Sequence, residues 1–266
     1  MFLAFTRSVP LSIHQCELTH LSRELIDYAR AVEQHAVYEA CLRGLGCRVE
    51  RLPDAPDLPD SVFVEDAAVV FEDVAVIARP GAMSRRPEVE AMAAALAPYR
   101  TLASIEAPGT LDGGDVLVTP GRVFVGISGR TNDEGTRQLR AILAPRGFEV
   151  IAVPVTGCLH LKSAVTVAYL PPQGGRGVLL INPAWIDAAR FTDFVLIEVD
   201  PSEPAAANVL RLGAHVICAG EHPKTRARLE AAGLQTFPVP AGELAKAEGG
   251  VTCCSVILDR RTTLGS

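Results

Sequence analysis

The feature that most constrains the fold is a repeated order of predicted elements: strand, strand, helix, strand. The clearest copy begins at residues 61–80, "SVFVEDAAVVFEDVAVIARP", where two strands join at Glu72 and Asp73. The Ala- and Leu-rich stretch 86–99 predicts a helix, because these residues have high helix propensity. Residues 101–106, "TLASIE", predict the closing strand. One such unit is too small to fold alone, so its recurrence decides the architecture.

Three further copies follow the same order. The second covers residues 113–155 and has a Pro-Gly turn in its hairpin. The third covers residues 160–199, with a short helix expected near Asp187, and the fourth covers residues 207–240.

The fifth copy is divided between the two ends of the sequence. Residues 249–259, "GGVTCCSVILD", can pair with residues 1–9, and a helix at about 23–45 and a strand at 47–53 then complete the unit. Five units closed in this way predict a radial α/β array around a central channel, as one domain spanning residues 1–266. The alternative is an open mixed α/β sheet with ordinary hairpins, and the pattern alone leaves it open.

Composition excludes several classes of protein. The chain has 266 residues, is 48% hydrophobic and carries a formal net charge of −6, which suits a sizeable core and disfavours a nucleic-acid surface. Its apolar stretches are shorter than the roughly 20 residues that span a bilayer, and "MFLAFTRSVPLSI" lacks the basic start of a signal peptide. We therefore expect a cytoplasmic enzyme that binds neither nucleic acid nor membrane.

The cysteines indicate reduced thiols rather than a disulfide framework or a zinc ribbon. They are odd in number, scattered, and contain no C-x-x-C pair: Cys16, Cys41, Cys47, Cys158, Cys218, Cys253 and Cys254. Packing is the default role for the first five, because cysteine is among the most often buried residues. If residues 249–259 form a strand, Cys253 and Cys254 point to opposite faces, so one reaches the channel while the other packs.

Polar residues at the start of each predicted strand pair should converge on the channel. A thiolate needs a neighbouring histidine or cation near neutral pH, and His160 in "CLHLKS" is a candidate base for Cys253. Asp112 in "LDGGDV" can orient the imidazole, giving a Cys-His-Asp set. The alternatives are packing for the cysteine and a hydrogen-bonded structural role for the histidine. "GGDV" precedes a strand rather than a helix, so we expect no nucleotide cofactor.

Glu65 and Asp66 are adjacent in an otherwise apolar predicted strand. Burying unpaired charge costs several kcal/mol, so a cationic partner is expected, and a guanidinium fits two carboxylates best. The alternative is a structural ion pair within the chain, with Arg85, Arg86 or Arg130.

Six motifs in order resemble the dimethylarginine dimethylaminohydrolase family: "DSVFVEDAAVV", "RPGAMSRR", "LDGGDV", "VGISGRTN", "CLHLKS" and "GGVTCCS". The resemblance implies the five-bladed α/β propeller of guanidine-modifying enzymes, which agrees with the repeat count. It also implies hydrolysis of Nω-methylated arginines to citrulline and an amine, through a covalent cysteine intermediate, by a monomer or homodimer that needs no metal or other cofactor.

The resemblance further assigns roles to individual residues. Cys253 is the nucleophile, His160 the general acid and base, and Asp112 its orienting carboxylate. The substrate contacts come from both side chains and backbone. The guanidinium is assigned to Glu65 and Asp66; the α-amino group to Asp60 and the carbonyls of Leu18 and Ala247; the α-carboxylate to Arg85 and Arg130. The glycines before Cys253 leave room for the substrate to approach.

Two groups of alternatives remain at this stage. Arginine deiminase, agmatine deiminase and amidinotransferases would share Cys253 and His160 while holding the substrate differently. A non-catalytic binding module on the same fold, as in a ribosome-binding translation factor, would not need the cysteine, histidine and carboxylate set.

Overall fold

A computed structural model describes residues 2–259, so residue 1 and residues 260–266 of the predicted domain lie outside the described part. Within it, the strands form five separate three-stranded sheets. Their strand orders are β15-β1-β2 (Val256–Asp259, Phe2–Thr6, Arg48–Arg51), β3-β4-β5 (Ala68–Val70, Val74–Ile77, Thr101–Ser104), β6-β7-β8 (Val116–Thr119, Arg122–Ile127, Glu149–Pro154), β9-β10-β11 (Val165–Tyr169, Val178–Ile181, Val195–Glu198) and β12-β13-β14 (Leu210–Leu212, His215–Ala219, Gln235–Val239).

Every sheet has the same internal pairing. In four sheets the central strand pairs antiparallel with the strand before it in the sequence and parallel with the strand after it. In the fifth sheet, β1 pairs antiparallel with β15 and parallel with β2. Short turns join β3 to β4, β6 to β7 and β12 to β13, and Gly121 between β6 and β7 has φ of 72°, a left-handed conformation that glycine adopts without strain. A parallel neighbour requires a crossover connection, which the intervening helices supply.

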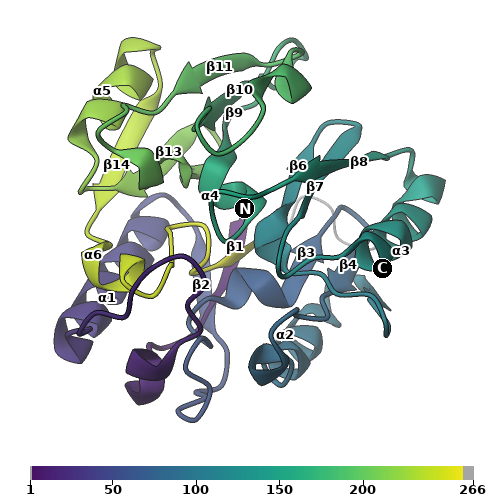
Figure 1. Ribbon diagram of the computed structural model, residues 1–266, viewed down its shortest axis with the longest axis vertical. Helices are drawn as coiled ribbons and strands as arrows, with labels where there is room; N and C mark the ends of the chain where they lie inside the picture. Colours follow the sequence, from purple (N-terminus) through teal and green to yellow (C-terminus); the bar gives the residue numbers. More distant parts are fainter. Residues whose placement is uncertain (1, 260–266) are drawn as a thin grey trace.

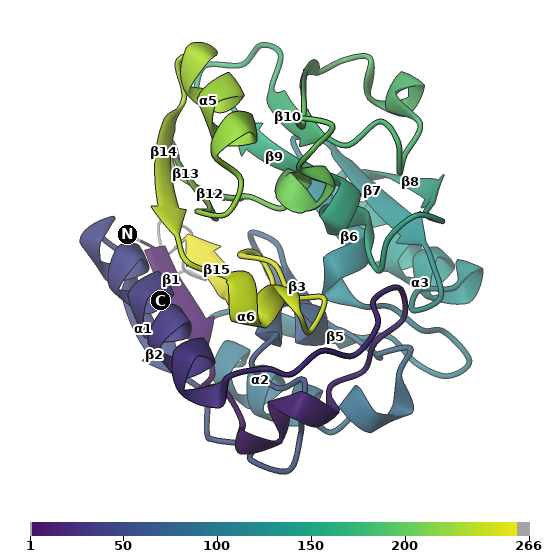
Figure 2. The ribbon, with the colours of Figure 1, turned by 60° about the vertical axis from the view of Figure 1, so that its left-hand side comes forward.

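The longer helices occupy the outside of the molecule. The longer ones are α1 (Tyr28–Gly44), α2 (Glu88–Leu96), α3 (Asp133–Leu143) and α5 (Pro223–Ala231), and the short ones are α4 (Leu161–Ala164), α6 (Gly242–Ala245) and the 3-10 helices η1 (Leu11–Gln15), η2 (Val64–Ala67), η3 (Met83–Arg85), η4 (Gly113–Asp115), η5 (Ala144–Arg146), η6 (Ala188–Phe191) and η7 (Pro204–Ala207). Figures 1 and 2 show α1, α3 and α5 at the periphery. The helix expected near Asp187 is the 3-10 helix η6, so this crossover is shorter than the others.

The hydrophobic core is divided into five clusters, and each lies between two neighbouring sheets. One cluster, for example, joins Leu3 of β1 to Ala75 of β4, and another joins Leu212 of β12 to Ala4 of β1. The remaining three clusters link the other neighbouring pairs of sheets in sequence order. Because this series of contacts closes on itself, the arrangement is propeller-like, and the alternative of one open sheet is wrong.

The two ends of the sequence share one sheet, as predicted. β1 pairs antiparallel with β15, with Phe2 opposite Asp259 and Phe5 opposite Val256. All seven cysteines carry free thiols, and of the five assigned to packing, Cys41 alone is half-buried while the other four are buried. Over residues 2–259, none of the helices is both long and apolar enough to cross a membrane.

Three predicted strand beginnings are instead short helical turns. "VEDA" forms η2, "GGD" forms η4, and "LKSA" forms α4, each directly before the first strand of its sheet. The expectation that Glu65 and Asp66 lie in a strand is therefore wrong. Residues 251–254 form a turn, and β15 begins only at Val256, so the strand expected from residue 249 is also shorter.

Candidate active site

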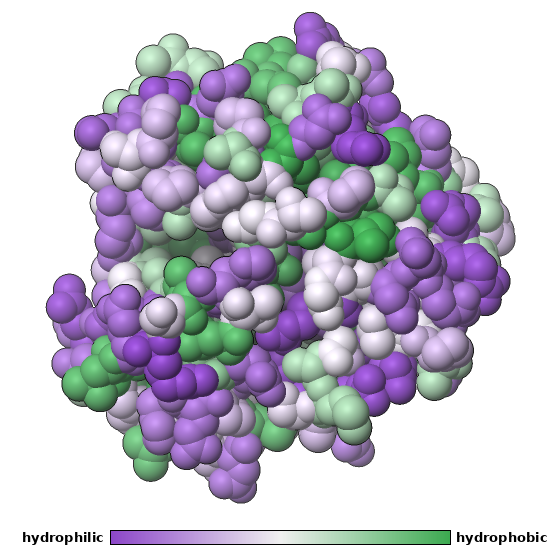
Figure 3. Space-filling model, viewed as in Figure 1, coloured by the Kyte–Doolittle hydropathy of each residue, from purple (hydrophilic) through white to green (hydrophobic). Residues whose placement is uncertain are grey.

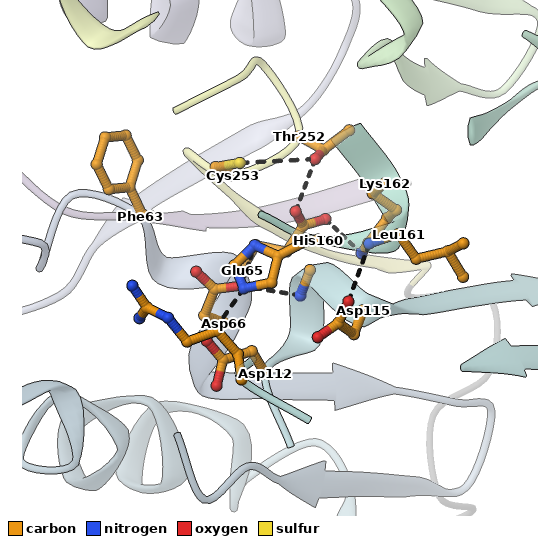
Figure 4. Close-up of polar contacts among 12 residues, drawn as sticks. Phe63, Glu65, Asp66, Asp112, Asp115, His160, Leu161, Lys162, Thr252 and Cys253 are labelled. Carbon is orange, nitrogen blue, oxygen red and sulfur yellow. Dashed lines mark hydrogen bonds and ion pairs between the residues drawn. The ribbon is translucent and has the colours of Figure 1, made fainter. Parts of the chain in front are cut away.

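Short turns carry the polar side chains of the site. The helical segments η2, η4, α4 and η7 and the turn 251–254 each precede the first strand of a sheet. Because the sheets surround one axis, turns at equivalent positions come together. Figure 4 shows side chains from η2, the start of η4, the start of α4 and the turn 251–254 grouped in one place. The predicted convergence of these segments is confirmed.

His160 is held between two carboxylates. Its Nε2 lies 3.1 Å from Oδ2 of Asp112, and its Nδ1 lies 3.9 Å from Oδ1 of Asp66. Burial disfavours the charged ring, but the charge of Asp66 and the hydrogen bond to Asp112 outweigh it and raise the pKa of His160 to about 9. With Nε2–H donated to Asp112, Nδ1 is the nitrogen left to exchange a proton with a substrate.

Asp66 is bound on its other side by an arginine. Nη1 of Arg85 donates to Oδ2 of Asp66 at 2.6 Å, and the backbone N–H of Gly114 donates to Oδ1 at 2.8 Å. Burial opposes ionisation, but His160 and Arg85 outweigh it and lower the pKa of Asp66. A Cβ on Gly114 would lie 2.6 Å from Nδ1 of His160, so glycine is what permits the histidine and Asp66 to approach.

Glu65 points away from Asp66. Its carboxylate pairs with Nζ of Lys162 at 2.6 Å and accepts a 2.6 Å hydrogen bond from the hydroxyl of Thr252. Glu65 and Lys162 line a different cavity, of about 210 Å³, on the strand side of the site. Adjacent residues of a 3-10 helix diverge by about 120°, which explains why the structure separates two carboxylates that the sequence places together.

The two adjacent cysteines have different surroundings. Cys253 is half-buried and its Sγ accepts a 3.3 Å hydrogen bond from the N–H of Gly250, whereas Cys254 is 1% exposed and packs in a core cluster. The structure therefore separates the two side chains as expected, although a turn rather than strand alternation does so, and the role of Cys253 as nucleophile stays a prediction. Burial, followed by the charges of Glu65 and Asp66, raises the pKa of Cys253 to about 12. The free site thus holds a thiol, which an incoming cation would help to ionise.

The glycines before Cys253 accommodate protein side chains. A Cβ on Gly249 would lie 2.2 Å from the ring of Phe63, and one on Gly250 would lie 2.4 Å from the side chain of Asn208. The expectation that both glycines leave room for a substrate is wrong in this respect. Gly249 also lines the site cavity. A side chain at this position would collide with the ring of Phe63 whether or not a substrate is bound.

Asn208 is a site residue that sequence reasoning missed. Its Oδ1 accepts from the N–H of Thr252 at 2.9 Å, and its Nδ2 donates to Oγ1 of Thr252 at 3.0 Å and to the carbonyl of Lys162 at 3.2 Å. It therefore braces the turn that carries Cys253. Its position in the sequence could have indicated this role, because Asn208 stands just before the first strand of the fourth unit, where the other site residues also stand in their units.

Asp115 was missed as well. Its carboxylate accepts from the N–H of Leu161 at 2.9 Å and from the hydroxyl of Ser128 at 2.6 Å. Ser128 Oγ in turn accepts from the N–H of Arg130 at 3.0 Å. One buried carboxylate thus connects the segment after His160 to the loop that presents Arg130.

A small cavity joins the site residues. It is lined by Glu17, Asp60, Phe63, Asp66, Arg85, Arg130, Leu159, His160, Ala247, Glu248, Gly249 and Cys253. Of the predicted residues in the described chain, Leu18, Glu65 and Asp112 are outside this lining. Asp112 lies behind His160, and Leu18 is half-buried in the segment over the cavity. The free volume is about 10 Å³, room for about one water molecule.

The segment from Cys16 to Ile26 covers the cavity, and we call it the lid. Glu17 N–H donates to both oxygens of Asp60, and Nη2 of Arg130 donates to the hydroxyl of Thr19 at 3.3 Å. The carboxylate of Glu248 accepts from three consecutive lid amides, those of Thr19, His20 and Leu21, at 2.5–3.1 Å. A larger ligand can enter only when these contacts open.

Glu248→Gln should therefore loosen the lid. An amide has a single acceptor oxygen and no charge, so the lid loses charge-assisted hydrogen bonds of about 1.5–3 kcal/mol. We expect trypsin to cleave after the lid residue Arg23 about 10- to 100-fold faster, because cleavage follows the population of the open form. Glu221→Gln is the matched control, since Glu221 also accepts from two backbone amides, of Ala241 and Gly242, away from the lid. Equal cleavage rates in the two variants would contradict the role of Glu248.

One group of residues has the composition of a metal site. Ligand atoms of Asp66, Asp112 and His160 lie within 4.8 Å of one another, and all three residues are buried. The two carboxylates are already engaged, because Asp66 binds Arg85 and Asp112 accepts from the N–H of Gly81 and from His160. The arrangement suits proton transfer at His160.

Comparison with known proteins identifies the family. No family model matches the sequence. Among curated proteins, N(G),N(G)-dimethylarginine dimethylaminohydrolase of Streptomyces coelicolor is 43% identical over 242 residues, covering 91% of this chain and 91% of the relative. The protein of the same name from Pseudomonas aeruginosa is 36% identical over 240 residues, covering 90% and 91%. The chain belongs to the dimethylarginine dimethylaminohydrolase family.

Solved structures of dimethylarginine dimethylaminohydrolases agree with this membership. The enzyme from Pseudomonas aeruginosa, as a cysteine-to-serine variant complexed with citrulline, superposes with a TM-score of 0.89 at 33% identity, covering 96% of this chain and 98% of that one. A histidine-to-glycine variant forming an adduct with S-methyl-L-thiocitrulline gives a TM-score of 0.88 at 34% identity, covering 97% and 100%. The N-terminal domain of the arginine dihydrolase ArgZ, at 18% identity and a TM-score of 0.84, covering 97% of this chain and 97% of that one, shares the fold.

Proposed function

We propose that this enzyme hydrolyses Nω-methylated arginines, asymmetric dimethylarginine and monomethylarginine, to citrulline and dimethylamine or methylamine. The observation that carries the proposal is the composition of the cavity. Cys253, His160 and Asp66 lie in the same cavity as Asp60 and Arg130. The first three residues suit reaction at a guanidinium carbon. Asp60 and Arg130 suit the charged α-amino and α-carboxylate groups of an amino acid.

Each end of the substrate has a complementary partner in this proposal. Asp66 holds the guanidinium, and Arg130, with the remaining Nη1–H of Arg85, holds the α-carboxylate. Asp60 receives the α-amino group, together with the backbone carbonyls of Leu18 and Ala247. Burial raises the pKa of Asp60 although Arg85 and the N–H of Glu17 oppose this, and an ammonium group would restore its charge.

Glu65 acts indirectly in this proposal. The family resemblance assigns it to the guanidinium, whereas its contacts are with Lys162 and Thr252. Through Thr252 it supports the turn that carries Cys253. Its negative charge also acts electrostatically on the thiol of Cys253, and it favours binding of a cationic substrate beside that thiol.

The proposed reaction has two stages. The guanidinium charge lowers the pKa of Cys253, its proton passes to solvent, and the thiolate attacks the guanidinium carbon. His160 then donates its Nδ1 proton to the departing amine as the carbon–nitrogen bond breaks, which leaves a thiouronium on Cys253. The neutral imidazole takes a proton from water, and the hydroxide attacks the same carbon. The carbon–sulfur bond then breaks, and the hydroxyl proton passes to the departing sulfur, which gives citrulline and restores the thiol of Cys253. Side chains and water supply every group in this scheme, so it requires no cofactor.

We also propose the finer architecture implied by the repeats. The five sheets would be the blades of one propeller domain with strand, strand, helix and strand in each blade, the blade of β9, β10 and β11 using η6 as its helix. The free thiols of all seven cysteines support a cytoplasmic location. The expected assembly is a monomer or homodimer.

The proposed function is tested by substrate comparison. The purified protein is incubated with asymmetric dimethylarginine, monomethylarginine, arginine and agmatine, and citrulline and the released amine are measured. We expect stoichiometric citrulline and methylamine or dimethylamine from the two methylated substrates. Citrulline from arginine alone would overturn the proposal in favour of a deiminase.

A further inference from the structure

A second cavity adjoins the catalytic one. It has a volume of about 380 Å³, within the range of about 300–1,000 Å³ that is typical of small-molecule sites. Its walls come from the loop before His160, from Trp185, from η7 and α6, and from the glycines before Cys253. Figure 3 shows the molecule hollowed left of its centre. We call this the side cavity.

The side cavity meets the catalytic cavity at its reactive end. Leu159, Glu248 and Gly249 line both cavities. Gly250 also lines the side cavity, and its N–H donates to Sγ of Cys253. In contrast, Asp60, Arg85 and Arg130, at the end assigned to the α-groups, belong to the catalytic lining.

The wall of the side cavity is built for an uncharged group. Trp185 is the largest side chain in its lining, and it approaches the loop before His160 closely because position 157 is glycine. A Cβ on Gly157 would lie 2.8 Å from Cδ1 of the indole. The carboxylate of Glu248, which also borders the cavity, is already occupied by three lid amides. An alkyl or aryl group gains dispersion contacts with the indole without leaving a buried charge unpaired.

We propose that the side cavity holds the substituent on the leaving nitrogen, so that the enzyme accepts uncharged Nω-alkyl and Nω-aryl groups larger than methyl. This inference rests on the proposed function. The leaving nitrogen must face His160 to receive its proton, and the side cavity opens beside that residue through Leu159. A substituent on that nitrogen is therefore directed into the side cavity, where burial of its CH₂ groups stabilises binding.

The first test uses a series of substrates. Nω-methyl-, Nω-propyl- and Nω-benzyl-arginine are compared by release of citrulline and of the matching amine. We expect kcat/KM for the propyl and benzyl substrates to be at least one-tenth of the methyl value. A lower ratio, with dimethylarginine still hydrolysed, would overturn this inference and leave the proposed function standing. Failure to hydrolyse dimethylarginine at all would overturn both.

The second test alters the side cavity itself. Ala245→Phe places a ring at its mouth from an exposed position of α6, and Trp185→Ala removes its apolar wall. We expect each to lower kcat/KM for the propyl and benzyl substrates at least tenfold and to change the methyl value less than threefold. Ala231→Phe, at an exposed position of α5, is the matched control. Equal losses on all three substrates would contradict a substituent site.

Discussion

Cys253→Ser should lower the rate of dimethylarginine hydrolysis by at least about 10⁴-fold, while Cys254→Ser stays within about threefold of the wild type. Loss of a catalytic nucleophile has effects of this size in enzymes that form covalent intermediates. Cys253 lines the catalytic cavity, whereas Cys254 is 1% exposed and its Sγ faces the carbonyl of Gly250 at 3.7 Å. The neighbouring thiol therefore cannot replace the nucleophile.

The comparison needs a control for folding. Cys254→Ser places a more polar atom in a core cluster, and we expect it to lower the free energy of unfolding by about 1–2 kcal/mol. Cys253→Ser should unfold near the wild-type temperature and still bind dimethylarginine, as calorimetry would measure. Equal losses of activity in the two variants, or normal turnover in Cys253→Ser, would contradict the assignment.

His160→Gln should lower the rate by about 10²- to 10⁴-fold, the usual contribution of a general acid or base. The variant lacks both the donor for the departing amine and the base for the attacking water. Because the second stage needs the base, any adduct that does form on Cys253 should persist, and its mass would appear on the intact protein. Asp112→Asn should lower the rate less than His160→Gln does, because it keeps the shape of the side chain beside Nε2 and removes only its charge.

The pH dependence gives a second measurement of His160. The pKa of His160 is raised to about 9, so the proton donor is present below that pH and kcat/KM should fall above it. The folded state also binds this proton more tightly than the unfolded state, whose histidine has a pKa near 6.5. Its stabilising contribution is complete below about pH 6.5 and is lost as the pH rises through about 9. The wild type should therefore lose more stability between pH 7 and pH 10 than His160→Gln does. An unchanged alkaline limb in the variant would contradict the assignment.

The repeats could be predicted because they depend on local signals. Hairpin turns, an Ala-rich helix and short β-branched runs identify each unit, and the number of units then suggests a closed array. Single-turn helices have no periodic signature, so η2 and η4 looked like the beginnings of strands. This error explains why Glu65 and Asp66 were expected to act together, although the structure directs one to Lys162 and the other to His160.

The candidate site was predictable where chemistry restricts residue type. A nucleophile, a base and a carboxylate at equivalent strand beginnings identified Cys253, His160 and Asp112. Asn208 and Glu248 were not assigned roles, because each acts through backbone amides of distant segments that no local pattern specifies. The pKa of Cys253 was also beyond sequence reasoning, since it depends on burial and on two carboxylates placed by another part of the chain.

The pairing of β1 with β15 has a consequence for biosynthesis. The turn that carries Cys253 leads directly into β15, which among the described residues pairs with β1, a strand made much earlier than β15. During translation, β1 therefore cannot form its antiparallel pairing until β15 has been synthesised, long after β1 itself. A nascent or truncated chain that lacks β15 can contain His160 and Asp112 but cannot hold Cys253 beside them. The rest of the fold is thus synthesised before Cys253 can be positioned. We expect fragments of this enzyme that lack β15 to have no catalytic activity.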